Sequence, residues 1–86
     1  MVRLNDSVMK TDVDGEIVLL DSASGHYFGL NVVGSRMLDL AITLDGREIV
    51  VHRLLDEFDA SEETLSRDYD ALISDLVTKG LIVKDE

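Results

Sequence analysis

Asp14-Gly15 constrains the fold of this chain more than any other feature of the sequence. The dipeptide lies between two runs rich in β-forming residues, VMKTDV at 8–13 and EIVLLD at 16–21. Asp-Gly is a preferred pair for a two-residue type I′ turn, because both central residues of that turn take positive φ angles. The sequence therefore predicts a β-hairpin that spans residues 8–21.

A third strand is predicted directly after the hairpin. Segment 22–25 (SASG) has the composition of a turn, and the short run HYFGL follows at 26–30. Alternation along a strand gives its side chains two faces, with His26, Phe28 and Leu30 on one and Tyr27 and Gly29 on the other. We expect a three-stranded antiparallel sheet.

From Asn31 onward the apolar residues recur at helical spacing. Asn31 is a suitable N-cap for a first helix. Asp45 and Glu48 have the spacing of a capping box, which predicts the start of a second helix. The expected inward positions are Val33, Met37, Leu40, Ala41 and Leu44 in the first helix and Val50, Val51, Leu54, Leu55 and Phe58 in the second.

Ser61 is expected to cap a third helix, whose first turn carries Glu62 and Glu63. Gly80 has the position of the left-handed residue in a Schellman motif, and a short apolar tail follows at 81–83. In that motif Leu81 contacts Leu76. The apolar stripe of this helix consists of Leu65, Tyr69, Leu72, Ile73, Leu76 and Val77.

The order of the predicted elements, strands first and helices after, defines the fold class. A three-stranded sheet is not stable without helices packed against it. The chain has 86 residues, a length that suits one domain. We therefore predict a single α+β domain over residues 1–86.

The charge of the chain restricts its partners. The 18 acidic residues outnumber the 8 basic ones, and the net charge is −10. Such a surface repels phosphates and anionic lipids and attracts cationic segments, although acidity can also serve only solubility. We expect no nucleic-acid or membrane partner. The chain lacks cysteine and any apolar run that fits a signal peptide or a membrane span, so a cytoplasmic location is expected.

The sequence offers no set of residues for catalysis. Its two histidines, His26 and His52, lack metal-binding spacing, and no nucleotide-binding or nucleophile motif occurs. Asp68 and Asp75 lie on one edge of the third helix, but a metal pair would need further ligands that nothing nearby provides. We expect neither enzyme activity nor a cofactor or metal. The Asp68/Asp75 edge is either solvated or meets a partner.

The order of several short motifs resembles the PqqD-like family, in particular the standalone leader-binding proteins of lasso-peptide biosynthesis. The first half carries VLLD at 18–21, GHYFGLN at 25–31 and Gly34. The second half carries FDASEE at 58–63, Asp68, Leu72, Leu76 and GL at 80–81. The similarity extends over about residues 4–83.

This resemblance implies a winged-helix-like fold and a peptide-binding function. A leader segment of a ribosomally made precursor peptide would add as a strand along 26–31, beside the third helix at 61–79. It would then be delivered to a leader peptidase of the transglutaminase-like type, or to a radical SAM enzyme in a PqqD-type pathway. The sequence supports strand addition independently, because nothing in 26–31 protects an exposed sheet edge.

The residues expected to contact the leader come from the third strand and the third helix. Tyr27 and Phe28, with Leu72, Ile73 and Leu76, are candidate pocket walls, while Asp68 and Asp75 would form a polar rim. Leu30, Leu72 and Leu76 could instead be core residues only. The complete expected set is His26, Tyr27, Phe28, Gly29, Leu30, Asp68, Leu72, Asp75 and Leu76.

Two other functions fit less well. A winged-helix DNA-binding protein needs a basic recognition helix. The third helix offers Arg67 and Lys79 against five acidic residues. An acyl carrier protein needs an Asp-Ser-Leu motif at a helix start, whereas Ser74-Asp75-Leu76 has another order deep in a helix. The exposed strand edge could also pair with a second copy of the chain.

Overall fold

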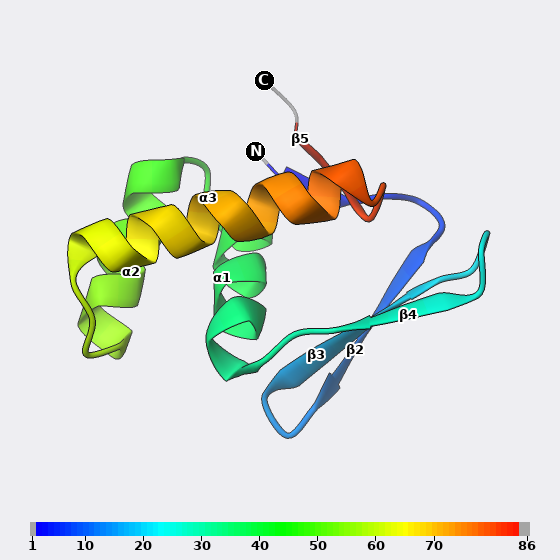
Figure 1. Ribbon diagram of the computed structural model, residues 1–86, viewed down its shortest axis with the longest axis horizontal. Coiled ribbons are helices and arrows are strands. Elements are labelled where there is room, and N and C mark those ends of the chain that lie inside the picture. The colour runs from blue at the N-terminus through cyan, green and yellow to red at the C-terminus, as the bar shows by residue number, and fades with distance from the viewer. Residues whose placement is uncertain (1, 85–86) are drawn as a thin grey trace.

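The computed structural model describes residues 2–84 and confirms the predicted α+β class (Figure 1). The three helices gather at one end of the molecule and a twisted sheet lies beside them. The elements in chain order are β1 (Val2–Leu4), β2 (Val8–Val13), β3 (Glu16–Asp21), β4 (His26–Gly29), α1 (Val32–Thr43), α2 (Arg47–Glu57), α3 (Glu62–Thr78) and β5 (Ile82–Lys84).

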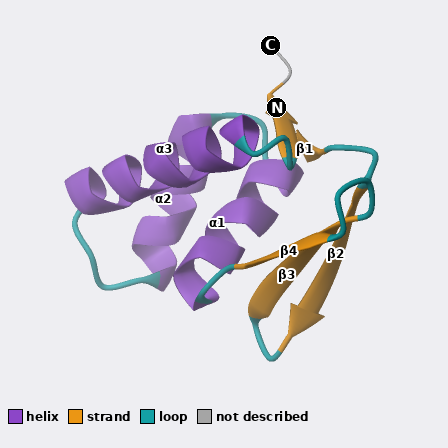
Figure 2. Ribbon diagram, turned by 45° about the vertical axis from the view of Figure 1, so that its right-hand side comes forward, coloured by secondary structure: helices purple, strands orange, loops and turns teal. Residues whose placement is uncertain are grey.

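Strands β2, β3 and β4 form the predicted antiparallel sheet in that order. Asp14 and Gly15 have φ angles of 54° and 83°, as the type I′ turn requires. One face of the sheet packs against the helices, and its central residues Ile17 and Leu19 are fully buried. The other face is not covered by a helix (Figure 2).

The two ends of the described chain form a second, two-stranded sheet that the sequence analysis did not predict. β1 pairs antiparallel with β5, with Leu4 opposite Ile82 and Val2 opposite Lys84. The expected apolar tail is therefore a strand. Val2, Leu81 and Ile82 are buried in the core. Such short runs form strands only when the tertiary fold brings them together. The local sequence pattern therefore does not predict this strand pair.

Most helix ends follow the predicted chemistry. The Asn31 side chain accepts the Gly34 N–H at 2.7 Å, and Ser61 accepts the Thr64 N–H at 3.1 Å. At the end of α3, Gly80 has a φ of 74° and the Leu81 N–H donates to the Leu76 carbonyl at 3.0 Å, as in a Schellman motif.

The start of α2 differs from the prediction. Gly46, with a φ of 125°, is the N-cap, and no side chain caps this helix. Glu48 is then the second residue of α2 and not the third, so the Asp45–Glu48 capping box does not form. Glu48 still lies in the first turn, where a carboxylate is favourable.

Ser35 is the one buried polar residue of α1, and it connects the helix to the sheet. Its hydroxyl accepts the Ile17 N–H at 2.7 Å and donates to the Leu30 carbonyl at 3.2 Å. The side chain is only 2% exposed. Ser35 therefore holds the start of β3 and the segment after β4 against α1.

Ser35→Ala should lower the free energy of unfolding by about 1–3 kcal/mol, because the buried Ile17 N–H loses its acceptor. Urea denaturation would measure this. The matched control is Ser74→Ala on the exposed side of α3, which should change stability by less than about 0.5 kcal/mol. Equal effects of the two substitutions would contradict the structural role of Ser35.

Asp21 holds the turn that leads into β4. Its carboxylate accepts the Ser7 hydroxyl at 3.0 Å, the Ala23 N–H at 3.1 Å and the Ser24 hydroxyl at 3.0 Å. These hydrogen bonds, that from Ser7 first, lower the pKa of Asp21 below its ordinary value of 3.8. The ionised form is therefore the one that stabilises the turn.

Asp21→Asn should make the protein less stable at neutral pH, and the difference from the wild type should disappear in acid. Because the folded pKa is lowered, the ionic contribution is complete above the ordinary value of 3.8 and is lost as the pH falls through the lower folded value. Urea denaturation from neutral pH to about pH 2 would show this convergence. A constant difference at every pH would contradict it.

Candidate functional site

β4 is an edge of the three-stranded sheet, and half of its backbone points to that edge. The Leu30 N–H donates to the Ile17 carbonyl at 2.8 Å, so the backbone of Leu30 points toward β3. Residues whose backbone points toward the neighbouring strand alternate along an antiparallel ladder, so His26 and Phe28 also bond to β3. Tyr27 and Gly29 therefore direct their N–H and C=O groups away from β3, toward the open edge.

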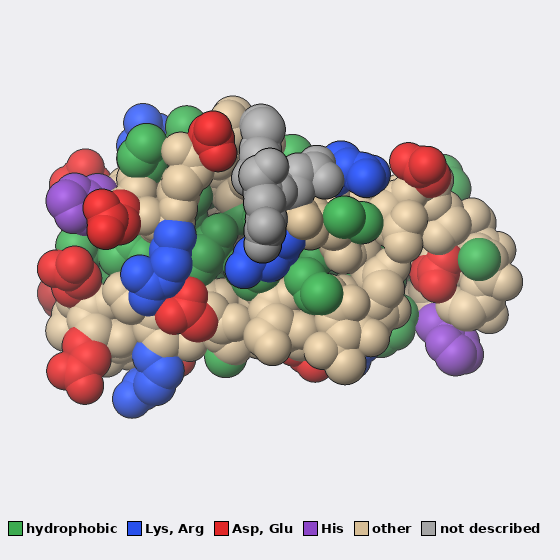
Figure 3. Space-filling model, turned by 90° about the horizontal axis from the view of Figure 1, so that it is seen from above, with side chains coloured by type: hydrophobic (Ala, Val, Ile, Leu, Met, Phe, Trp, Pro, Cys, Tyr) green, Lys and Arg blue, Asp and Glu red, His purple; other side chains and the backbone are tan. Residues whose placement is uncertain are grey.

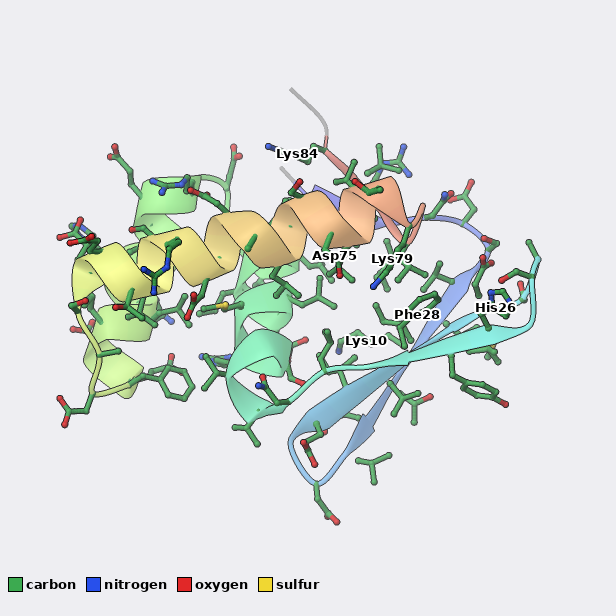
Figure 4. The ribbon with its side chains drawn as sticks, in the orientation of Figure 1. Lys10, His26, Phe28, Asp75, Lys79 and Lys84 are labelled. Carbon is green, nitrogen blue, oxygen red and sulfur yellow. The ribbon has the colours of Figure 1, made fainter. Side chains whose placement is uncertain are left out.

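Phe28 is the side chain of β4 that faces α3. It lies opposite Leu19 in the register, on the face of the sheet that packs against the helices, and it is half-buried. The Lys79 ammonium lies 5.3 Å from the centroid of the Phe28 ring, within the range of a cation–π contact. Figure 4 shows Asp75 and Lys79 pointing from α3 toward Phe28.

One stripe of α3 faces the β4 edge. It consists of Asp68, Leu72, Asp75 and Lys79, which recur at the spacing of a helix face. Half-buried Leu72 lies near Gly34, since its Cδ2 atom would be 4.0 Å from a Cβ at that position. Within this stripe the Lys79 ammonium forms an ion pair with the Asp75 carboxylate at 2.9 Å. The stripe offers an apolar centre between charged groups.

The structure places Phe28 and Asp75 around Lys79, with Leu72 on the same face of α3, but it separates Tyr27 from them. Tyr27 lies opposite Leu20, on the face of the sheet that turns away from the helices, and it is 70% exposed. The expectation that Tyr27 forms a pocket wall with α3 is therefore wrong. Side chains of consecutive strand residues point to opposite faces, so Tyr27 and Phe28 cannot line one pocket.

Two further expected pocket walls, Ile73 and Leu76, belong to the core. They are 4% and 2% exposed, and they pack in the main hydrophobic cluster. Leu30 also packs against this cluster, although it is half-buried. His26 is exposed at the outer end of β4, and Asp68 is exposed on α3 with Arg67 at 3.7 Å. These placements leave Phe28 and Leu72 as the apolar surface of the site.

Lys79 was not among the predicted site residues. Sequence spacing could have identified it, because it follows Asp68, Leu72 and Asp75 on the same helix face. Its contact with Phe28 joins residues far apart in the chain and needed the structure. Arg67 of α3 and the C-cap residue Lys79 are each paired with a carboxylate.

The open edge of β4 suits binding of an extended chain. The two histidine side chains lie at opposite ends of the molecule, as Figure 3 shows. Among residues 2–84, no three His, Asp or Glu side chains are close enough together to hold a metal ion. None of the helices in this range is both long and apolar enough to cross a bilayer.

A cavity lies on the opposite face of α3. Its volume is about 490 Å³, and its lining includes Ala41, Leu44 and Ile73. At its rim Arg47 forms a bidentate ion pair with Asp70, at 2.7 and 2.8 Å, which lowers the pKa of Asp70. This cavity shares no lining residue with the β4 edge.

Comparison with known proteins shows which family and which solved structures this chain is similar to. The profile of the family described as coenzyme PQQ synthesis protein D (PqqD) matches residues 16–82. A solved structure of TbiB1 in complex with the TbiA(beta) leader peptide is 31% identical, with a TM-score of 0.87 and 98% of each chain covered.

A second solved structure, a lasso peptide synthetase B1 complexed with the leader peptide, is also similar. It is 25% identical, with a TM-score of 0.88, and the alignment covers 96% of this chain and 98% of that one. No curated protein sequence matches the chain significantly. The family profile and the identity to TbiB1 over nearly the whole chain lead to one conclusion: this protein belongs to the PqqD family.

Proposed function

We propose that this protein binds the leader segment of a ribosomally made precursor peptide as an added strand on β4 and delivers it to a leader peptidase. The observation that carries this proposal is the open edge of β4, where Tyr27 and Gly29 direct backbone groups outward beside α3. The two similar solved proteins are each complexed with a leader peptide, which supports the proposal. The precursor is of the lasso-peptide class.

Backbone pairing supplies only part of the affinity. Tyr27 and Gly29 offer two N–H and two C=O groups, and each net hydrogen bond contributes about 0.5–1.5 kcal/mol. The total of about 2–6 kcal/mol is less than the roughly 8 kcal/mol of a micromolar complex. Side chains must therefore supply the rest, and Phe28 with Leu72 is the apolar surface next to this edge.

The direction of the bound strand follows from the sheet. Each strand of the sheet is antiparallel to its neighbour, and an antiparallel addition would run from the Leu30 end toward His26. The first residues of the segment would then lie near Leu72 and Asp68, and the last near Lys79. Hydroxyl or basic groups suit the first position, and an acidic group suits the last.

The remaining site residues have secondary roles in this arrangement. Tyr27 acts through its backbone and not through its ring, and Gly29 also contributes backbone groups. Leu30 and Leu76 support the site from the core, while His26 and Asp75 border it. In this proposal the protein presents the peptide, and a separate leader peptidase of the transglutaminase-like type acts on it.

N-methylation of single backbone positions in the leader peptide should weaken binding with a period of two. Only alternate N–H groups of an added strand point to β4, and those between them point away. Fluorescence anisotropy with labelled peptides would measure the affinities. Loss of about 0.5–1.5 kcal/mol per hydrogen bond corresponds to a decrease in affinity of about two- to twelvefold.

The N-methyl positions between the sensitive ones are the internal control, because they change the same chain without removing a bond to β4. Uniform weakening at every position would contradict strand addition, since it would mean that the peptide binds in another backbone conformation. No saturable binding of the unmodified leader would contradict the function itself.

Leu72→Ala and Leu76→Ala should separate binding from stability. Leu76 is 2% exposed, so its truncation should cost about 2–5 kcal/mol of stability. Truncation of half-buried Leu72 should lower the free energy of unfolding by only about 1 kcal/mol. The same truncation should weaken leader binding about tenfold, which corresponds to about 1.4 kcal/mol of binding free energy. Urea denaturation and anisotropy would measure the two effects. Unchanged leader affinity in Leu72→Ala would contradict its role in the site.

A further inference from the structure

The face of the sheet that turns away from the helices, here called the outer face, is apolar and exposed. Its side chains follow from the register of the three strands. Met9 and Tyr27 are 60% and 70% exposed, and Val13 is 54% exposed. The outer face consists of Met9, Leu20 and Tyr27 in one row, Thr11, Val18 and Gly29 in the next, and Val13 with Glu16 at the hairpin end.

No described helix or strand covers this face. The sheet contacts the helices through its other side, where Ile17 and Leu19 are fully buried. Figures 1 and 2 show α1, α2 and α3 on that side alone. Met9, Leu20 and Tyr27 lie side by side in one row, with Val18 in the next. Exposed apolar surfaces of this kind mark sites where another protein binds.

The charges around the outer face are acidic. Glu16 belongs to it and Asp14 lies in the adjoining turn, both exposed. Lys10, the basic residue of the three strands, points to the other side and pairs with Asp39 at 2.9 Å. A second copy of the chain would bring together two molecules of net charge −10, which is unfavourable at long range. A partner with basic residues around an apolar centre is complementary.

We propose that the outer face docks the enzyme that processes the bound peptide, through an apolar patch bordered by lysine or arginine on that enzyme. This inference rests on the proposed function. β4 connects the two surfaces, because the Tyr27 backbone points to the peptide edge and its side chain belongs to the outer face. An enzyme seated there lies directly beside the leader strand, which places the peptide within its reach.

The test uses two substitutions on β2, the strand farthest from the peptide edge. In Met9→Lys/Val13→Lys the outer face loses two apolar side chains and gains charges of the same sign as the basic border of the partner, which repel it. Ile49→Lys on α2 is the matched control, since Ile49 is 55% exposed and belongs to another element. Circular dichroism and thermal unfolding would verify that each variant is folded.

The probe is a purified leader peptidase of the transglutaminase-like type, titrated by biolayer interferometry. We expect the double variant to bind the peptidase at least tenfold more weakly than the wild type and the control. Leader affinity by anisotropy should stay within twofold of the wild type. Peptidase binding by the wild type should also weaken as salt is raised, as expected for oppositely charged borders.

Three outcomes would overturn the inference. One is equal peptidase affinity in the wild type and the double variant, and another is no peptidase binding by the wild type. The third is a wild-type dimer in sedimentation analysis that the double variant abolishes, since a second copy would then cover the outer face. Failure of the proposed function is distinguishable, because it would appear as absent leader binding whatever the peptidase result.

Discussion

The Ser35 hydroxyl accepts the Ile17 N–H at 2.7 Å and donates to the Leu30 carbonyl at 3.2 Å, so one side chain of α1 holds both β3 and the end of β4. The bond to Ile17 is buried, so breaking it leaves the Ile17 N–H without a partner and without water. The two Ser35 bonds set the position of β4 relative to the helices. The distance between the peptide edge and the α3 stripe depends on this connection.

α3 serves two purposes on its two sides. Leu65, Ile73 and Leu76 hold the helix in the core, while the Asp68–Lys79 stripe faces the β4 edge. In the free protein Lys79 lies over Phe28 and pairs with Asp75. A segment added to the β4 edge would either accept this ammonium with an acidic group or displace it. In the proposed complex, Lys79 would thus add selectivity to backbone bonds that carry little sequence preference.

Local features of the sequence predicted most of the fold. The Asp14-Gly15 turn, the Asn31 cap and the Gly80 helix end depend on residues close in the chain, and all three form as expected. The β1–β5 pair could not be predicted, since its strands lie at opposite ends of the chain. The α2 cap was predicted at the wrong residue, because a capping-box spacing of Asp45 and Glu48 does not determine where the backbone turns.

The sequence by itself determined the three-stranded sheet, the three helices, the acidic charge and the strand that forms the open edge, β4. Those properties depend on residue type and short-range spacing. Only the tertiary structure decided that Leu76 is core, that Lys79 reaches Phe28 and that Tyr27 lies on the uncovered face. The reason is physical: which neighbours a side chain meets is set by packing between elements far apart in the chain.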